Sequence, residues 1–474
     1  MNGNLLFVGG DLSGIQKFIY NISSKKAMVS LKGRSAYLKE YTDKVCNSIL
    51  DIDEIKQSPN SKDEMTIYCS GGKFYLQVPD TEAIRCKIDE LIIRIEQELW
   101  QEHLGQLSIN IAYVPFRYQN ELVTVCDETG NIGILWRHIT EKFAILKNQK
   151  FKHEILNQYT NYFKPEKSGG DVNVCAITGI ESNKCVKIDK KDGEGDEIWV
   201  LPTVKQHILK GQQLRNQQNF KTLEEYANKS YLGVLRMDID GLGKKFIHSG
   251  FKDISAYKKF SKRLDDFFAN ELLEFQSTAE FRDDMNIVYA GGDDIFAVGK
   301  WNKVIDFAEK VRTEFQKYIN DATLSISGGI AVVSPKFPIA KAALLAGDAE
   351  DKAKAYNKGQ KNAFALFGTA VSWNKEFDYV KRYKTRLYNM CNEDNMPRSI
   401  LHKIMLFADM KQRGELKYIW HTAYFFKRFK DGKSAEIKSF CEELEKDLYN
   451  NPKGYELLSL SARWAELELK EVKS

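Results

Sequence analysis

The sequence predicts an α+β protein that contains a duplicated ferredoxin-like domain, and two pairs of matching stretches support this. An apolar run that leads into an aspartate, a small turn residue and a glycine occurs at 4–20 and again at 231–248. Two adjacent glycines between β-rich runs occur at 66–78 and again at 286–298. Both pairs are separated by nearly the same length of chain, which indicates one duplicated domain.

Each copy is expected to run strand, helix, hairpin, helix, strand, because short β-rich runs alternate with apolar residues at helical spacing. In the second copy the expected strands are 232–240, 285–290, 294–299, 323–333 and 362–368, and the expected helices are 255–276, 302–319 and 338–359. This is the element order of a ferredoxin-like palm domain. The first copy follows it less completely, from residue 4 to about residue 116.

Four parts are predicted along the 474 residues, whose 43% apolar content is ample for several cores. They are a degenerate first palm at 1–116, a linker domain at 117–228, a second palm at 229–374 and an α-helical C-terminal domain at 375–474. The last part has the apolar periodicity of helices.

Composition excludes several classes of protein. The net charge of +5 is mild and does not by itself imply a polyanionic partner. The eight cysteines are scattered and no signal-peptide pattern is present, so reduced thiols in a cytoplasm are expected. No run of 18 apolar residues occurs, so no membrane span is expected.

The glycine pair of the second copy, Gly291 and Gly292, is followed by Asp293 and Asp294. In a ferredoxin-like sheet this turn joins the two central hairpin strands, and the strand that ends with Asp238 and Asp240 lies beside them. Carboxylates placed so close repel one another unless a cation neutralises them, and Mg²⁺ or Mn²⁺ with oxygen ligands would do so. Two such ions could activate a 3′-hydroxyl and stabilise a pyrophosphate leaving group. The alternative is a solvated hairpin turn.

Seven motifs resemble, in this order, the large polymerase-cyclase subunit of type III CRISPR effector complexes in its Csm form. They span about residues 4 to 375 and read GDLSGIQKFIY, SKKAMVSLKGRSAYL, SGGKFYL, LRMDIDGLGKKF, YAGGDDIFAVGKW, PKFPIAKAALLAGDAEDKAK and KNAFALFG. The resemblance implies two palm domains that bind two ATP molecules between them. It also implies synthesis of cyclic oligoadenylates through 3′–5′ bonds when the complex pairs with target RNA. The implied partners are the other effector subunits, guide RNA and target RNA.

The resemblance implies that Asp238, Asp293 and Asp294 hold the metal ions, with the backbone carbonyl of Ile239 as a further ligand. In the first copy Lys73 and Phe74 stand in place of the two aspartates, and a lysine cannot ligate Mg²⁺. One palm is therefore expected to be active and the other inactive. Further nucleotide-binding candidates are Ser13, Gly14, Arg34, Ser35, Gly71, Gly72, Lys73, Asp240, Gly291, Gly292, Lys352 and Lys361.

Alternatives remain for several of these candidates. Ser13, Gly14, Arg34 and Ser35 could serve only turn and helix-cap chemistry, with Ser35 capping a helix. For any one of the candidate lysines, a solvated helix face is the competing interpretation.

The chain departs from the family pattern in two further places. Many family members begin with a histidine-aspartate nuclease domain, but here the first histidine is His103 and no His-Asp dipeptide occurs, so this nuclease is expected to be absent. The linker has Cys175 and Cys185 where relatives often hold zinc with four cysteines, and two cysteines cannot close a tetrahedral site. Structural zinc is therefore not expected, and 190–197 is expected to be an exposed loop.

The segment 411–430 interleaves basic residues with aromatic ones, which fits either RNA binding or an amphipathic helix with a buried aromatic face. By resemblance, the C-terminal domain packs on the small subunits. The favoured function is an ATP-consuming nucleotidyltransferase that makes cyclic oligoadenylates. The alternatives are a catalytically silent RNA-binding scaffold and synthesis of another adenylate-containing messenger, whereas a diguanylate cyclase is disfavoured because the turn lacks the Glu-Phe of the GGDEF pattern.

Overall fold

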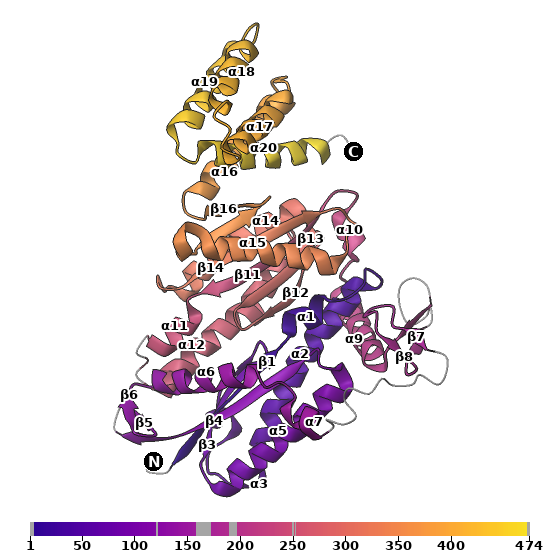
Figure 1. Ribbon diagram of the computed structural model, residues 1–474, viewed down its shortest axis with the longest axis vertical. Coiled ribbons are helices and arrows are strands. Elements are labelled where there is room, and N and C mark those ends of the chain that lie inside the picture. The colour runs from indigo at the N-terminus through magenta and orange to yellow at the C-terminus, as the bar shows by residue number, and fades with distance from the viewer. Residues whose placement is uncertain are drawn as a thin grey trace. The chain divides into compact units, whose positions relative to one another are not determined.

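The computed structural model describes residues 4–119, 122–157, 172–188, 197–248, 251 and 253–471. It divides into two compact units, Met1–Ser325 with Val333–Leu344, and Ile326–Val332 with Leu345–Ser474. Two six-stranded sheets and a helical C-terminal region confirm the predicted α+β class (Figure 1). The four-part division of the chain stays a prediction.

The first sheet is antiparallel, with the strand order β2-β3-β1-β4-β5-β6. Phe7, on β1, packs with Trp136 and Phe143 of α6 (Gly133–Lys147) on one face of this sheet, while α2 and α5 contact the strands as well. Because helices cover the sheet, β1 is buried along almost its whole length. The strands are β1 (Leu5–Ser13), β2 (Thr66–Ser70), β3 (Lys73–Pro79), β4 (Ser108–Gln119), β5 (Leu122–Val125) and β6 (Glu128–Gly130). The helices before the linker are α1 (Ile15–Tyr20), α2 (Ala27–Leu50), α3 (Asp53–Lys56), α4 (Lys62–Met65) and α5 (Glu82–His103).

The linker contributes short strands and several helices. Gly33 of α2 and Gly211 of α9 lie where these two helices touch: a Cβ on Gly33 would meet the carbonyl oxygen of His207 at 1.7 Å, and one on Gly211 would meet that of Val29 at 1.9 Å. The linker helix α9 is therefore packed against the backbone of α2. Besides α6, the linker elements are α7 (Lys152–Asn157), β7 (Asn173–Val174), β8 (Glu181–Ser182), β9 (Val186–Ile188), β10 (Ile198–Val200), α9 (Pro202–Gln218) and α10 (Leu223–Ala227).

The second sheet repeats the topology of the first, with the order β12-β13-β11-β14-β15-β16. Its first four strands have the same pattern as β2-β3-β1-β4, which supports the duplication inferred from the sequence. The predicted helix at 255–276 is interrupted by a π-helical turn, η2 (Phe267–Glu271). The strands are β11 (Leu232–Asp240), β12 (Met285–Gly291), β13 (Asp294–Lys300), β14 (Ser325–Val333), β15 (Ala363–Leu366) and β16 (Thr369–Ser372). The helices around them are α11 (Leu242–His248), α12 (Ile254–Asp266), α13 (Leu272–Ser277), α14 (Trp301–Ile319) and α15 (Ile339–Gly359).

The strand pairing shifts the alignment of the two hairpins by one residue relative to the alignment of their glycine pairs in the sequence. Asp11 pairs with Lys73 across β1 and β3, just as Asp238 pairs with Asp294 across β11 and β13. The amide of Leu12 donates to the carbonyl of Gly72, and the amide of Ile239 to that of Asp293. Lys73 therefore takes the place of Asp294, and not of Asp293 as the sequence alignment had it.

The two hairpin turns explain this shift. We call β2, the turn Gly71–Gly72 and β3 the first hairpin, and β12, the turn Gly292–Asp293 and β13 the acidic hairpin. Both turn residues of the first hairpin have positive φ, the pattern of a type I′ turn. In the acidic hairpin only Gly292 does, the pattern of a type II′ turn, whose second position accepts a side chain. The acidic hairpin can therefore carry an aspartate inside its turn.

The two turns touch each other. A Cβ on Gly71 would lie 2.4 Å from the backbone nitrogen of Gly292, and one on Gly291 would lie 3.1 Å from the Cα of Gly71. No side chain fits between them. Gly71 is favoured both by this close approach and by its positive φ, whereas Gly291 is favoured by the close approach alone.

The second unit contains a helical bundle with its own core, built from α16 (Glu376–Asn392), α17 (Ser399–Gln412), α18 (Tyr418–Phe429), α19 (Ala435–Asn450) and α20 (Gly454–Glu471). On α18 the aromatic residues divide between core and surface. Phe426 is fully buried and Tyr418 and Phe425 pack partly against the core, whereas Trp420 is 75% and Tyr424 61% exposed. The exposed rings of Trp420 and Tyr424 are not explained by packing in the core, so RNA binding by this helix stays a prediction.

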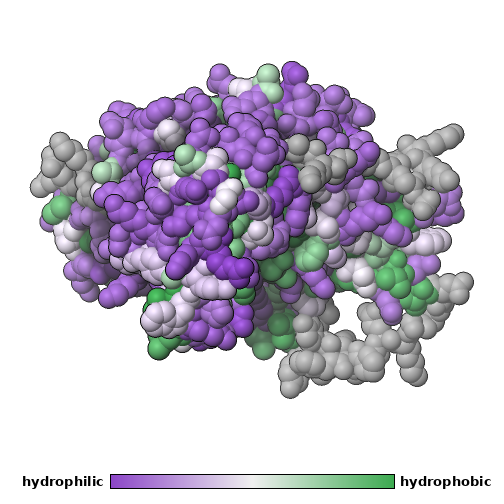
Figure 2. All heavy atoms as spheres, turned by 90° about the horizontal axis from the view of Figure 1, so that it is seen from above, coloured by the Kyte–Doolittle hydropathy of each residue, from purple (hydrophilic) through white to green (hydrophobic). Residues whose placement is uncertain are grey.

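Among the helices that the structure describes, none combines the length and the apolar character needed to cross a bilayer. The face drawn in Figure 2 is predominantly hydrophilic, with apolar side chains in small separate patches.

Replacing Phe426 with Ala should destabilise the helical bundle by about 3–5 kcal/mol, because it removes a fully buried aromatic ring. Replacing Trp420, which is exposed on the same helix, with Ala should change the free energy of unfolding by no more than about 0.5 kcal/mol. Urea unfolding followed by circular dichroism measures both. Equal losses would show that Trp420 belongs to a core.

Replacing Gly71 with Ala should destabilise the first unit more than the same change at Gly179. Both glycines have positive φ, which costs an alanine about 1–2 kcal/mol. Only at Gly71 would the new methyl group also meet backbone, since nothing lies within 4 Å of a Cβ on Gly179; this should add about 1–3 kcal/mol. Thermal unfolding of the two variants tests the difference, and equal shifts in Tm would mean that the turns do not abut.

Candidate active site

Three carboxylates meet at the end of the acidic hairpin. Asp238 comes from the end of β11, Asp293 from the turn and Asp294 from the start of β13. One ligand atom from each lies within 4.8 Å of the others, and all three residues are half-buried. The pairing of Asp238 with Asp294 and the bond from the Ile239 amide to the Asp293 carbonyl hold the group together. The structure thus brings together the three residues expected to bind metal.

The donor set fits a hard divalent cation. All three residues offer carboxylate oxygens, which Mg²⁺ and Mn²⁺ prefer, and carboxylates this close repel without a cation. Asp240, at the same strand end, is buried and accepts a hydrogen bond from the Ser325 hydroxyl at 2.7 Å. It therefore supports the strand end rather than joining the carboxylate group.

The first palm supplies polar groups to this cluster. Lys73 Nζ lies 3.7 Å from Asp293 Oδ2, and Gln16 Nε2 donates to Asp294 Oδ2 at 3.5 Å. Partial burial opposes the charged ammonium, but the neighbouring carboxylates, Asp293 foremost, outweigh it and raise the pKa of Lys73 above its ordinary value. Lys73 is thus a fixed positive charge between the two turns.

The matching position of the first palm cannot offer a comparable acidic group. Asp11, the counterpart of Asp238, forms an ion pair with Lys147 of α6 at 2.7 Å. Lys73 stands where Asp294 stands in the other copy. The three matching positions are thus Asp11, Gly72 and Lys73, and Lys147 neutralises the one remaining acid, so a divalent cation is not favoured there.

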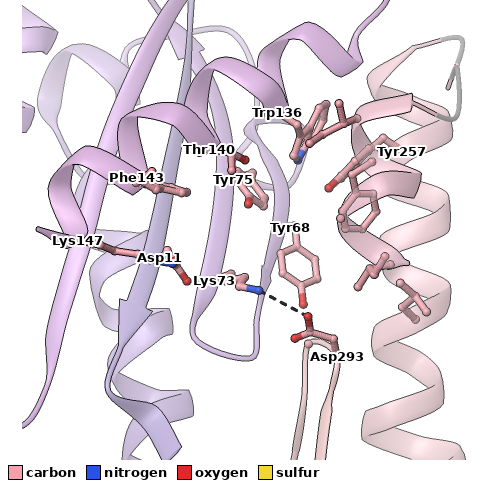
Figure 3. A pocket seen from close by; sticks show the side chains of 17 residues that line it. Asp11, Tyr68, Lys73, Tyr75, Trp136, Thr140, Phe143, Lys147, Tyr257 and Asp293 are labelled. Atoms are coloured by element: carbon pink, nitrogen blue, oxygen red, sulfur yellow. Dashed lines mark ion pairs between the residues drawn. The ribbon is translucent and has the colours of Figure 1, made fainter. Parts of the chain in front are cut away.

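A pocket of about 440 Å³ adjoins the carboxylates and is lined by both palms and by α6. Figure 3 shows Lys73, Tyr68 and Asp293 at its lower edge and Tyr75, Trp136 and Tyr257 around its upper part. The rings of Trp136 and Tyr257 stack with centroids 3.8 Å apart. Burial raises the pKa of Tyr75 to about 12, so its phenol stays neutral. A planar, mostly apolar group beside an anion would match this lining.

Sequence reasoning missed several residues of this site. Trp136 and Lys147 lie on α6, whose amphipathic pattern is ordinary, and no motif distinguishes them. Gln16 lies within the motif GDLSGIQKFIY, but the motif does not single it out. Asp265, on α12, is also close to the first hairpin; burial, with a contribution from Asp266, raises its pKa to about 7. The packing of α6 and α12 onto the first sheet brings Trp136, Lys147 and Asp265 close to the first hairpin.

Other predicted nucleotide contacts lie elsewhere. Arg34 is 1% exposed, donates to the carbonyl of Phe18, and lines a separate small cavity with His103 and His207. Ser35 lies well inside α2, which begins at Ala27, so the alternative of Ser35 as a helix cap is wrong. Gly14 has φ +91° and precedes α1.

The remaining candidates are placed only locally. The Ser13 hydroxyl accepts a hydrogen bond from Asn110 Nδ2 at 2.9 Å. Lys352 Nζ lies 3.5 Å from the carbonyl of Gly368, and Lys361 has φ +62°; both lysines belong to the second unit. Their contact with nucleotide stays a prediction.

In the linker, Cys175 and Cys185 are buried. Within the described ranges, Asp238, Asp293 and Asp294 form the one group of three or more potential metal ligands. The predicted exposed loop lies outside the described residues, except for Glu197, which pairs with Lys187.

Comparison with protein families gives two matches. The model of the Cas10/Cmr2 second palm domain matches residues 231–365, and that of the Csm1 subunit domain B matches residues 4–166. The second match includes α6 with Trp136 and Lys147. Together the two matches contain all the residues that line the pocket.

Curated relatives and solved structures agree with these matches. The single-strand-specific deoxyribonucleases Cas10/Csm1 of Enterococcus italicus and Mycobacterium tuberculosis are 26% and 25% identical over 84% and 92% of this chain. The chain spans 59% and 63% of their lengths. A crystal structure of a Csm1–Csm4 cassette in complex with pppApA matches with a TM-score of 0.68 and 18% identity, over 98% of this chain and 69% of the other. The chain is therefore a homologue of the Cas10/Csm1 large subunits of type III-A CRISPR systems, as its motifs predicted.

Proposed function

We propose that the chain is a nucleotidyltransferase subunit of a type III CRISPR effector complex that converts ATP into cyclic oligoadenylates when guide RNA pairs with target RNA. The observation that carries this proposal is the group of three carboxylates at the junction of two palms, beside an aromatic pocket. A scaffold gains nothing from three converging carboxylates, because their mutual repulsion destabilises the fold unless a cation is bound.

The pocket supports an adenine nucleotide as substrate. Trp136, Tyr257 and Tyr75 form a buried aromatic wall of the pocket, in which the first two rings stack on each other. Lys73 and Asp293 lie at one edge, where phosphates would be held with a metal ion. Related Csm1–Csm4 cassettes have been crystallised with ATP, with pppApA and with cA4, which supports adenylate chemistry. ATP is therefore the proposed substrate.

Asp238, Asp293 and Asp294 would hold Mg²⁺ or Mn²⁺, with the Ile239 carbonyl as a further ligand. When bound, such an ion neutralises phosphate charge and lowers the pKa of the attacking hydroxyl. In the reaction the 3′-oxygen of one adenylate bonds to the α-phosphorus of another, the bond to the bridging oxygen breaks, pyrophosphate leaves and the hydroxyl proton passes to solvent. Ring closure is the same step within one oligomer.

The first palm would hold the acceptor nucleotide without activating it. Lys73 and Lys147 place two ammonium groups near the pocket, and Asp11 is already neutralised by Lys147. Gln16 and Lys73 contact the carboxylates of the second palm, so both palms build one site. This arrangement supports a single catalytic centre for the whole chain. The proposed location, the cytoplasm, rests on the scattered cysteines.

Two alternatives belong to the same family: a silent RNA-binding scaffold, and synthesis of another adenylate-containing messenger. The decisive experiment is to incubate the assembled complex with labelled ATP, Mg²⁺ and matching RNA and to identify the products by mass. If no product forms, the result favours the scaffold. If the product is linear, or joins adenylate to another group, the result favours the other messenger.

Replacing Asp293 and Asp294 together with Ala should abolish product formation, because the ligands that hold the metal ions are lost. The matched control is Asp283→Ala with Asp284→Ala, a second adjacent pair in the same palm outside the carboxylate group. Product formation by mass spectrometry and assembly by size-exclusion chromatography measure the two effects. Unchanged synthesis in the first variant, or equal loss in the control, would contradict the mechanism.

The isolated chain should bind ATP but turn it over slowly, and the guide-loaded complex should accelerate when target RNA is added. The site is built from two palms, and misplacing the acceptor hydroxyl by about 1 Å costs around a hundredfold in rate. Comparing initial rates of the chain, the complex and the complex with matching or scrambled RNA tests this. Full-speed synthesis by the isolated chain would show that no RNA switch exists.

A further inference from the structure

The junction between the palms contains two lysines that reach from one palm to backbone carbonyls of the other. Lys32, on α2 of the first palm, donates to the carbonyl of Ile287 on β12 at 3.0 Å. Lys258, on α12 of the second palm, donates to the carbonyls of Asp63, at 3.1 Å, and of Glu64, both on α4. The helix α4 leads directly into β2. Each lysine thus ties its own helix to the chain that enters the other palm's hairpin.

The packing around the two lysines is reciprocal as well. The helix α2 contacts β12, and α12 contacts β2. The two lysine contacts are not exact counterparts of each other. In the strand pairing Thr66 takes the place of Ile287, whereas Lys258 binds the carbonyls of Asp63 and Glu64, just before Thr66. Both bonds nevertheless act on the first strand of a hairpin whose turn touches the opposite turn.

Lys32 acts next to a β-bulge of the acidic hairpin, which the first hairpin repeats between Thr66 and Tyr68. The pairing of β12 with β13 shifts between Ile287 and Tyr289, so Val288 is an extra residue. Such a bulge bends a strand and changes the direction of the residues after it, and here the strand continues to Gly292 and Asp293. The carbonyl that Lys32 holds immediately precedes the bulge. The hydrogen bond from Lys32 to this carbonyl therefore restrains the direction of the strand after the bulge.

The environment of Lys32 indicates that the bond is specific. Its side chain is 9% exposed, and its ammonium lies 5.8 Å from the Phe220 ring. Burial lowers the pKa of Lys32 to about 8. A buried ammonium costs free energy unless it is hydrogen-bonded, so the Ile287 carbonyl is a necessary partner. Next to Lys32, Gly33 forms the close contact of α2 with the linker helix α9, which restrains this part of α2.

We propose that Lys32 and Lys258 are positioning residues that hold the two hairpin turns against each other, with Lys32 setting the direction of the acidic hairpin through the carbonyl before its bulge. Neither lysine lines the pocket or contacts the three carboxylates, so neither is catalytic. Their effect on rate rests on the proposed function, whereas their effect on the hairpins does not.

The test compares Lys32→Met with Lys44→Met in the full chain. Both remove a lysine of α2, but Lys44 pairs with Glu98 inside the first palm. In hydrogen exchange followed by mass spectrometry, amides of 285–300 should exchange about tenfold faster in Lys32→Met, the effect of losing a charged hydrogen bond. They should be unchanged in Lys44→Met and close to wild type in Lys32→Arg, which keeps a cationic donor. Unchanged exchange in Lys32→Met would overturn the proposal.

Lys258→Met keeps the test decisive if Lys32→Met does not fold, because Lys258 is half-buried and its loss is better tolerated. Faster exchange of 66–79 is expected there but not in Lys262→Met, on the same helix. Equal exchange in the two variants would overturn the proposal.

A rate measurement separates positioning from general loosening. In the assembled complex, kcat for Lys32→Met should fall roughly tenfold to a hundredfold, with KM for ATP and the affinity for Mn²⁺ unchanged. A rise in KM with kcat unchanged would contradict a positioning role. If wild-type complex makes no product, the proposed function fails, while the exchange experiment still decides whether the lysines hold the hairpins.

Discussion

The contact between the two glycine turns is the constraint on which the site depends. Gly71 meets Gly291 and Gly292 so closely that a methyl group on Gly71 would overlap backbone. Because the turns are so close, Lys73, which follows the turn of the first hairpin, lies beside Asp293 in the turn of the acidic hairpin. Any group that moved the turns apart would separate Lys73 and Gln16 from the carboxylates. Duplication therefore created one composite site, because the two copies pack turn against turn.

Charge explains why the two copies differ. Three carboxylates in one place need a cation, and a second acidic group on the touching turn would add further repulsion across the junction. The first palm instead has Lys73 at the position of Asp294, and its remaining acid, Asp11, is paired with Lys147. The degenerate copy thus contributes positive charge beside three carboxylates, at a site for which we propose a triphosphate substrate. Degeneration of the first site complements the second.

Much of this architecture could be predicted from the sequence. The duplication, the strand order and the convergence of Asp238 with the acidic turn follow from two repeated patterns and from the topology that they indicate. The alignment of Lys73 could not be predicted, because matching the glycine pairs ignores that a type I′ and a type II′ turn begin at different residues. The burial of Arg34 could not be predicted either: its motif is polar, but Arg34 is 1% exposed and lines a separate small cavity, and its contact with nucleotide stays a prediction.

Residues supplied by packing between distant helices left no local signal. Trp136 and Lys147 sit on α6, whose apolar periodicity has an ordinary explanation, and only the docking of this helix onto the first sheet gives them a place at the pocket. Lys32 lies within one of the seven motifs, but its partner, like those of Lys258, is a backbone carbonyl, which no sequence pattern identifies. Motifs report the groups that the chemistry requires. The groups that bring two domains into register act through backbone and shape, so they become visible only when both domains are seen together.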